Sequence, residues 1–277
     1  MTKLRTALLA GALSALTFGG ALAQTPAEAP PAATEYTPSS GQDGKDVVWV
    51  PTAQALVDRM LEMAEVTKDD YLVDLGSGDG RTVITAAKRG VRAHGVEFNP
   101  DMVALSRKAA KAEGVAETAT FEQGDIFETD FSKASVVTLF LLTELNIRLR
   151  PTILEMKPGT RVVSNSFDMG DWQPDETAQA ASGCSSFCRA LKWVVPAKVA
   201  GEWRMDGGAL KLDQKYQMLT GALVKDGTST PITEAKMNGS EITFTAKGKR
   251  YTGRVDGAAM SGTVEGGGAW SATQNQT

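Results

Sequence analysis

The chain has 277 residues, 42% of them hydrophobic, and carries 29 basic against 33 acidic side chains, for a net charge of −4. This composition is that of a globular protein with one large domain or two smaller ones. An acidic chain without a basic run lacks the positive charge that nucleic-acid binding uses. One histidine and two cysteines leave no ligand set for a zinc site. The composition therefore argues against nucleic-acid-binding proteins and against a metal centre.

Residues 1–23 have the form of a secretory signal peptide. A basic start is followed by an apolar stretch over 7–18 and by the small residues Ala21-Leu22-Ala23 of a cleavage site. The stretch is shorter than the ~20 residues that cross a bilayer, so we expect no transmembrane span in the mature chain. Residues 24–45 hold four prolines and predict a disordered linker, with order beginning near Val47. We expect an exported, periplasmic protein.

Residues 46–195 alternate between helical and strand patterns. Apolar residues at helical spacing predict helices over 52–64, 81–88, 101–113 and 145–156. Short apolar runs predict strands over 71–75, 91–97, 118–122, 135–141 and 161–166. Strands that alternate with helices of this length indicate right-handed crossovers. The fold class predicted is therefore α/β, with a doubly wound, Rossmann-like parallel sheet.

Ligands of such sheets bind at the carboxyl ends of the strands. The first predicted strand runs into Asp74-Leu-Gly-Ser-Gly-Asp-Gly80, where glycines allow a tight turn and the following helix offers free N–H groups. This is not the dinucleotide fingerprint G-x-G-x-x-G, because Arg81 stands where the third glycine belongs. A dehydrogenase is therefore disfavoured.

Two more acids follow the next two predicted strands. Glu97 lies 23 residues after Asp74 and can accept both hydroxyls of a ribose. Asp125 can accept from an adenine amine, with Ile126 against the ring face. Any one acid here can be a simple helix cap. Three acids at three successive strand ends instead indicate an adenosyl ligand.

At these residues the sequence resembles the class I S-adenosylmethionine-dependent methyltransferases, and is similar to the seven-strand, non-SET protein lysine methyltransferases. The resemblance covers residues 47 to about 195. It is carried by Val73-Asp-Leu-Gly-Ser-Gly-Asp-Gly80, Gly95-Val-Glu-Phe-Asn-Pro100 and Met156-Lys-Pro-Gly-Thr-Arg-Val-Val-Ser164. It implies S-adenosylmethionine as the cofactor and a sheet closed by an antiparallel hairpin over 177–183 and 187–195.

The resemblance also assigns roles to single residues. The residues implied at the cofactor are Asp74, Gly76, Ser77 and Gly78 at its methionine part, Glu97 with Phe98 and Asn99 at the ribose, and Asp125 with Ile126 at the adenine. A protein lysine is the implied substrate. We expect Phe140, Leu142, Phe167 and Trp172 to line its pocket. Glu144 is the candidate to orient the amine or take its proton, the alternative being an acid at a helix start.

Cys184 and Cys188 lie at the turn of the expected hairpin. In an oxidising compartment two nearby cysteines usually pair, so we expect a disulfide, with a redox role as the alternative. The spacing is C-x-x-x-C rather than C-x-x-C, which disfavours the redox role.

Residues 196–277 read as about seven short strands between Gly, Asn and Asp turns, which predicts a small antiparallel barrel or sandwich. The predicted strands cover 202–205, 210–221, 231–236, 241–246, 250–255, 260–264 and 269–272. The aromatic residues expected in the core of this domain are Trp203, Tyr216, Phe244, Tyr251 and Trp270.

Two classes of function follow. The first is an enzyme that transfers a methyl group from S-adenosylmethionine to a protein lysine. The alternative is an exported protein that binds an adenosyl ligand without turnover and uses its β-domain for interaction.

Overall fold

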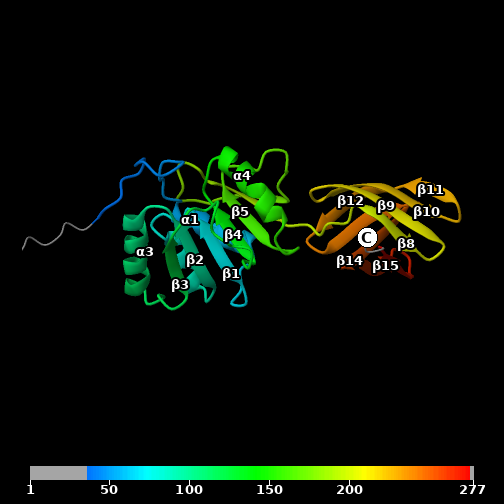
Figure 1. Ribbon diagram of the computed structural model, residues 1–277, viewed down its shortest axis with the longest axis horizontal. Coiled ribbons are helices and arrows are strands. Elements are labelled where there is room, and N and C mark those ends of the chain that lie inside the picture. Colours follow the sequence, from blue (N-terminus) through cyan, green and yellow to red (C-terminus); the bar gives the residue numbers. More distant parts are fainter. Residues whose placement is uncertain (1–35, 275–277) are drawn as a thin grey trace, which may run out of the picture. The chain divides into compact units, whose positions relative to one another are not determined.

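The computed structural model describes residues 36–274. The expected signal peptide and residues 24–35 of the expected linker lie outside this range. The described chain forms a sheet flanked by helices, followed by an all-β domain (Figure 1). Within residues 36–274, no helix has the length and apolar character needed to span a bilayer.

The first domain is built on a seven-stranded mixed sheet in the order β3-β2-β1-β4-β5-β7-β6. Its strands are β1 (Tyr71–Leu75), β2 (Arg92–Glu97), β3 (Ala119–Gln123), β4 (Val136–Leu139), β5 (Arg161–Asn165), β6 (Glu176–Gln179) and β7 (Arg189–Val194). β1 to β5 run parallel, whereas β7 is antiparallel to both β5 and β6. The Rossmann-like fold with a closing hairpin is therefore confirmed.

Helices cover both faces of this sheet because its central strands are buried on both sides. The helices are α1 (Gln54–Met63), α2 (Arg81–Lys88), α3 (Pro100–Ala112) and α4 (Thr143–Leu154). Apolar residues of α1, α2 and α3 share one core with Leu72, and those of α4 share another with Val73. Adjacent residues of β1 thus face opposite layers, as the pleat requires.

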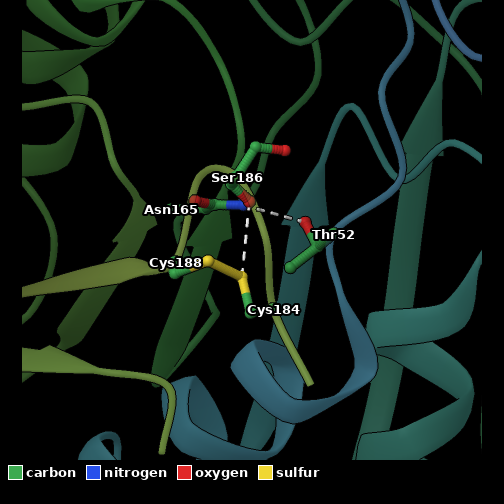
Figure 2. Close-up of a disulfide and its surroundings, with 5 residues drawn as sticks. All are labelled: Thr52, Asn165, Cys184, Ser186 and Cys188. Carbon is green, nitrogen blue, oxygen red and sulfur yellow. Dashed lines mark hydrogen bonds between the residues drawn. A yellow bond between two sulfur atoms is a disulfide. The ribbon is translucent and has the colours of Figure 1, made fainter. Parts of the chain in front are cut away.

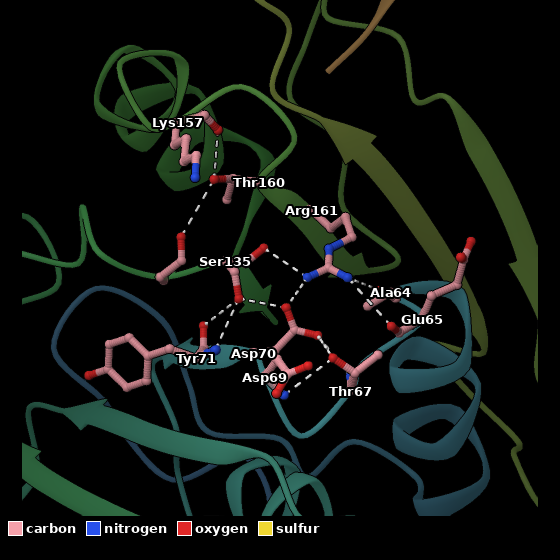
Figure 3. Close-up of polar contacts among 11 residues, drawn as sticks. Ala64, Glu65, Thr67, Asp69, Asp70, Tyr71, Ser135, Lys157, Thr160 and Arg161 are labelled. Carbon is pink, nitrogen blue, oxygen red and sulfur yellow. Dashed lines mark hydrogen bonds and ion pairs between the residues drawn. The ribbon is translucent and has the colours of Figure 1, made fainter. Parts of the chain in front are cut away.

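A polar network ties together the amino ends of β1, β4 and β5 (Figure 3). Asp70 accepts hydrogen bonds from Ser135 Oγ at 2.7 Å and the Thr67 N–H at 2.8 Å, and it forms an ion pair with Arg161. Arg161 also donates to the carbonyl of Ala64 after α1, at 3.0 Å. Burial alone would raise the pKa of Asp70, but the hydrogen bonds from Ser135, Thr67 and Arg161 outweigh it and lower that pKa. The network fixes the edge of the sheet opposite the glycine turn.

The second domain is an antiparallel barrel. Its strands are β8 (Gly201–Met205), β9 (Gly208–Lys215), β10 (Met218–Lys225), β11 (Thr228–Pro231), β12 (Thr233–Asn238), β13 (Glu241–Ala246), β14 (Lys249–Asp256), β15 (Ala259–Val264) and β16 (Ala269–Thr273). Pairing of β8 with β16 and of β9 with β10 closes eight strands into a ring, and β11 adds to β10 alone. The barrel alternative of the sequence analysis is therefore the right one, because full closure leaves no ring strand with a free edge.

The single strand expected over 210–221 is wrong. The chain reverses at Tyr216, which has a φ of +55°, and Lys215 pairs with Met218 across the turn. Tyr216 is also not in the barrel core. Its ring stacks on Trp172 at 5.7 Å between centroids, and its hydroxyl donates to Asp171 Oδ1 at 2.8 Å. The other four expected aromatic residues do pack together in or against the barrel core.

Candidate active site

The glycine turn after β1 brings the ends of the first two strands together. Gly76 and Gly78 both have positive φ angles, of 79° and 54°. The N–H groups of Gly76 and Ser77 donate to the Val96 carbonyl of β2, at 2.9 and 3.0 Å. A Cβ on Gly78 would come within 2.4 Å of the Trp49 indole nitrogen, so a larger residue would displace that ring. The turn therefore needs glycine both for its backbone conformation and for its packing.

Asp74 is a buried acid without a cationic partner. Its carboxylate accepts one hydrogen bond, from Thr138 Oγ1 of β4 at 2.6 Å, and no ion pair joins it to any residue of 36–274. Burial raises its pKa to about 7, and the negative charges of Glu97 and Asp79 raise it further against the opposing Thr138 bond. A buried carboxyl with so high a pKa, facing a pocket, is typical of a functional site.

Glu97 connects the glycine turn to the start of α3. One of its oxygens accepts from the Gly78 N–H at 2.8 Å, and the other accepts from the Asn99 N–H at 2.9 Å. Asn99 caps α3 through Oδ1, which accepts from the N–H groups of Asp101 and Met102. Phe98, between them, is 48% exposed. Each Glu97 oxygen keeps a free lone pair, so the carboxylate can still accept two ligand hydroxyls.

Asp125 lies beyond the end of β3 and pairs with Lys45. The ion pair and the hydrogen bond from Lys45, together with the Phe127 N–H, lower the pKa of Asp125. Ile126 packs against the core of the α4 face. The acid stays charged and half-buried beside an apolar side chain, an arrangement suited to a flat ring that carries an amine.

An N-terminal arm, residues 44–52, closes the same pocket, which the sequence analysis did not foresee. All nine of its residues line the cavity together with the turn and the strand ends. Lys45 reaches Asp125, and its ammonium lies 5.2 Å from the centre of the Phe98 ring. Thr52 Oγ1 accepts from Asn165 at the end of β5, at 3.2 Å. Residues 36–45, assigned above to the linker, thus include part of this arm and are held against the domain.

The nine residues expected at the cofactor all line this one cavity. They are Asp74, Gly76, Ser77, Gly78, Glu97, Phe98, Asn99, Asp125 and Ile126. Ser77 Oγ is buried there without a hydrogen-bond partner, which leaves it available to a ligand. An unpaired acid, a diol acceptor and an acid beside an apolar wall fit an amino acid, a ribose and an adenine in turn. The residues present therefore fit S-adenosylmethionine.

The side of the cavity at the end of β4 is apolar. Leu139, Phe140, Leu141 and Leu145 line it. Phe167, from the loop after β5, lies beside Phe140 at 6.2 Å between ring centroids. Leu142 is 37% exposed at the start of α4 and is not among the lining residues.

Trp172 and Glu144 lie elsewhere than expected. Trp172 is fully buried, packed between Trp193 and Tyr216, so it belongs to the core and not to a substrate pocket. Glu144 is exposed in the first turn of α4 and does not line the cavity. No hydrogen bond or ion pair to another described residue holds its carboxylate. Its position favours the helix-start alternative, in which the dipole stabilises an acid at the N-terminus.

The hairpin before β7 carries a disulfide between Cys184 and Cys188 (Figure 2). The loop it closes contains Phe187, which is 42% exposed and has a φ of +53°. The Ala180 N–H donates to the Cys188 carbonyl at 2.9 Å and closes the hairpin below the loop. Among residues 36–274, no group of three or more His, Cys, Asp or Glu is placed to hold a metal ion.

This fold, with acids at three strand ends around a glycine turn, defines a class I S-adenosylmethionine-dependent methyltransferase. Residues 74–176 match the family model described as the ANTKMT methyltransferase domain. The chain is 45% identical over 140 residues to a protein-lysine N-methyltransferase of Saccharolobus islandicus, covering 50% of this chain and 87% of the relative. The chain belongs to this family of protein-lysine methyltransferases, and its cofactor is S-adenosylmethionine.

Two further relatives extend the comparison. A lysine N-methyltransferase of ATP synthase from Rattus norvegicus is 37% identical over 130 residues, 47% of this chain and 60% of that protein. A solved structure from Salinibacter ruber is 49% identical, with a TM-score of 0.51, and covers 54% of this chain and 96% of that one. It is described as an RNA methyltransferase and contains S-adenosyl-L-homocysteine.

Proposed function

We propose that this protein transfers a methyl group from S-adenosylmethionine to the ε-amine of a lysine in a protein substrate. The observation that carries the proposal is the contrast within one cavity. Polar groups that fit the cofactor line one part of it, and Leu139, Phe140 and Leu141 line the end of β4. An apolar channel at that end lowers the pKa of an entering lysine, because burial disfavours its charged form.

The reaction asks the protein mainly for alignment. The cofactor supplies a methyl group bound to a positively charged sulfur. The neutral amine donates its lone pair to the methyl carbon while the carbon–sulfur bond breaks, and its electron pair stays on sulfur to give S-adenosylhomocysteine. The methylated ammonium then loses one proton to solvent. Donor and acceptor held about 3–3.5 Å apart in line are enough to supply much of the rate.

Asp74 would accept a hydrogen bond from the ammonium of the cofactor's amino-acid part. That cation would replace the partner that Asp74 lacks among residues 36–274, and it would favour the ionised acid. Glu97 would hold the ribose hydroxyls, with Phe98 and Asn99 beside it. Asp125 would accept from the adenine amine once Lys45 yields that carboxylate.

An RNA substrate is the main competitor, because the relative from Salinibacter ruber is described as an RNA methyltransferase. The net charge of −4 supports the protein substrate, since RNA binding draws on clustered positive charge. The curated relatives described as lysine methyltransferases support it as well.

The test is a methyl-transfer assay with labelled S-adenosylmethionine on bacterial envelope proteins and, in parallel, on total RNA. We expect label on protein only, at lysines mapped by mass spectrometry. Glu97→Ala should weaken cofactor binding at least roughly tenfold, because it removes charge-assisted hydrogen bonds of about 1.5–3 kcal/mol each. Label on RNA alone would replace the lysine assignment. Cofactor binding without any transfer would favour the non-catalytic binding protein.

We also propose that the protein is exported to an oxidising compartment such as the periplasm. The form of residues 1–23 and the Cys184–Cys188 disulfide support this, since disulfides persist mainly outside the reducing cytosol. Thiol titration of the denatured, unreduced protein from the cell envelope should find no free thiols. Two free thiols per chain would argue against export.

A further inference from the structure

Three phenylalanine rings gather at the edge of the sheet where the methyl acceptor must enter. Phe140 follows β4, Phe167 follows β5 and Phe187 precedes β7. The ring of Phe187 lies 5.4 Å from that of Phe140 and 5.9 Å from that of Phe167, between centroids. Because β7 is antiparallel to β5, its first residues lie beside the last residues of β5. Three neighbouring strands thus deliver one ring each to the same edge.

Phe187 differs from the other two rings in how it is held. Phe140 lines the cofactor cavity and Phe167 is half-buried, whereas Phe187 is 42% exposed. Its positive φ is uncommon for a residue other than glycine and needs support from its surroundings. That support is a five-residue loop whose ends, Cys184 and Cys188, are bonded to each other (Figure 2). An exposed aromatic side chain in a covalently closed loop is placed to contact a partner.

We propose that Phe187 binds the substrate lysine, and that the Cys184–Cys188 disulfide holds Phe187 in place for this. The inference rests on the proposed lysine methyltransferase activity. Packing of the aliphatic stem against Phe187 and Phe167 would direct the amine past Phe140 toward the methyl group. Aromatic faces also attract the charged ammonium before it loses its proton, through cation–π contact. Phe187 is thus a specificity-determining residue that touches substrate but not cofactor.

The disulfide makes this contact sensitive to reductant. Dithiothreitol transfers two electrons and two protons to the bond, which leaves the two thiols of Cys184 and Cys188 and oxidised, cyclic dithiothreitol. The opened loop gains conformational freedom, and Phe187 must then be ordered each time a substrate binds. Reduction should therefore weaken substrate binding and leave the cofactor site intact, since none of the nine cofactor residues belongs to this loop.

The experiment uses the full chain and a set of 15-residue peptides, each with one central lysine and varied flanking residues. Steady-state kinetics would be measured for the best peptide, with cofactor affinity and melting temperature alongside. Phe187→Ala should raise the peptide KM about fivefold, with kcat within about twofold and cofactor affinity unchanged. Phe187→Tyr, which keeps the ring, should restore a KM close to that of the natural protein. Met218→Ala, at an exposed apolar side chain of the barrel, is the matched control.

The double variant Cys184→Ser/Cys188→Ser separates the disulfide from the ring. It should raise KM by about two- to threefold, and dithiothreitol should do the same to the natural protein but nothing further to the double variant. An unchanged KM in Phe187→Ala, or an equal loss of cofactor affinity, would overturn the inference and leave the activity standing. If the natural protein methylates no lysine in peptides or envelope proteins, the proposed function fails and this inference fails with it.

Discussion

Two aspartates only four residues apart, Asp70 and Asp74, mark opposite edges of the same sheet. Both are buried, at 8% and 7% exposure. Asp70 has Arg161, Ser135 and Thr67 as partners, and its pKa is lowered. Asp74 has one hydroxyl partner, Thr138, and burial raises its pKa to about 7. The same residue type on one strand is thus stabilised at one edge and left short of partners at the other.

The difference shows how the fold separates stability from function. At the amino edge the network satisfies its acid with hydrogen bonds and a charge, so the acid contributes to folding (Figure 3). At the carboxyl edge the glycine turn, the unpartnered Ser77 hydroxyl and Asp74 leave binding capacity unused by the protein. Such unsatisfied groups cost stability and are retained where a ligand supplies the missing partners.

The largest effect is expected at the amino edge. Asp70→Ala should lower the free energy of unfolding by about 2–4 kcal/mol, because it leaves the Arg161 charge and the Ser135 hydroxyl without their partner in a mostly buried site. Urea unfolding followed by circular dichroism would measure this. Asp58→Ala, which removes an exposed ion pair with Arg89, should cost less than about 1 kcal/mol. Equal losses in the two variants would show that the network has no special role.

At the carboxyl edge the same kind of change should affect binding and not stability. Asp74→Asn should weaken S-adenosylmethionine binding by roughly 10- to 100-fold, because it removes a charge-assisted hydrogen bond to the cofactor ammonium. The free energy of unfolding should stay the same or rise, since the amide needs no charge buried at neutral pH. Titration calorimetry and urea unfolding of one preparation measure both. A strongly destabilised variant that keeps its cofactor affinity would reverse the comparison.

The two acids should also give opposite pH dependences. Between the ordinary value of 3.8 and about 7, the folded state holds the Asp74 proton that the unfolded state has lost, so the contribution of Asp74 to stability falls as pH rises. The pKa of Asp70 is lowered, so its contribution is present above 3.8 and is lost as pH falls through the folded value. Urea unfolding from pH 4 to 8 should therefore show a weaker decline toward pH 7 in Asp74→Asn. A slope equal to that of the natural protein would place the folded pKa of Asp74 near 3.8.

The sequence predicted the strand-end residues because period and position alone decide them. Each short buried strand ends in glycine or an acid, and parallel strands bring those ends to one edge. The arm carrying Lys45 and Trp49 was missed because its position depends on long-range contacts, with Asp125 and Gly78, that no local pattern encodes.

Tertiary packing also decided the other errors. Trp172 and Tyr216 stack on each other across 44 positions, which composition cannot show. The turn at Tyr216-Gln217 lacks the glycine or asparagine by which tight turns are usually recognised.

The smallest effect is expected at Glu144, where the sequence suggested a catalytic acid. Its carboxylate is exposed in the first turn of α4, and it neither lines the cavity nor pairs with another described residue. An exposed acid at a helix N-terminus contributes about 0.3–1 kcal/mol to stability through the dipole. Glu144→Gln should therefore lower the melting temperature slightly and change kcat by less than about twofold. General-base catalysis would contribute typically 10²–10⁴-fold, so a loss of that size, measured at saturating cofactor and peptide, would restore Glu144 to the catalytic machinery. Without it, proton release to solvent is sufficient, and the carboxyl edge acts by binding and alignment.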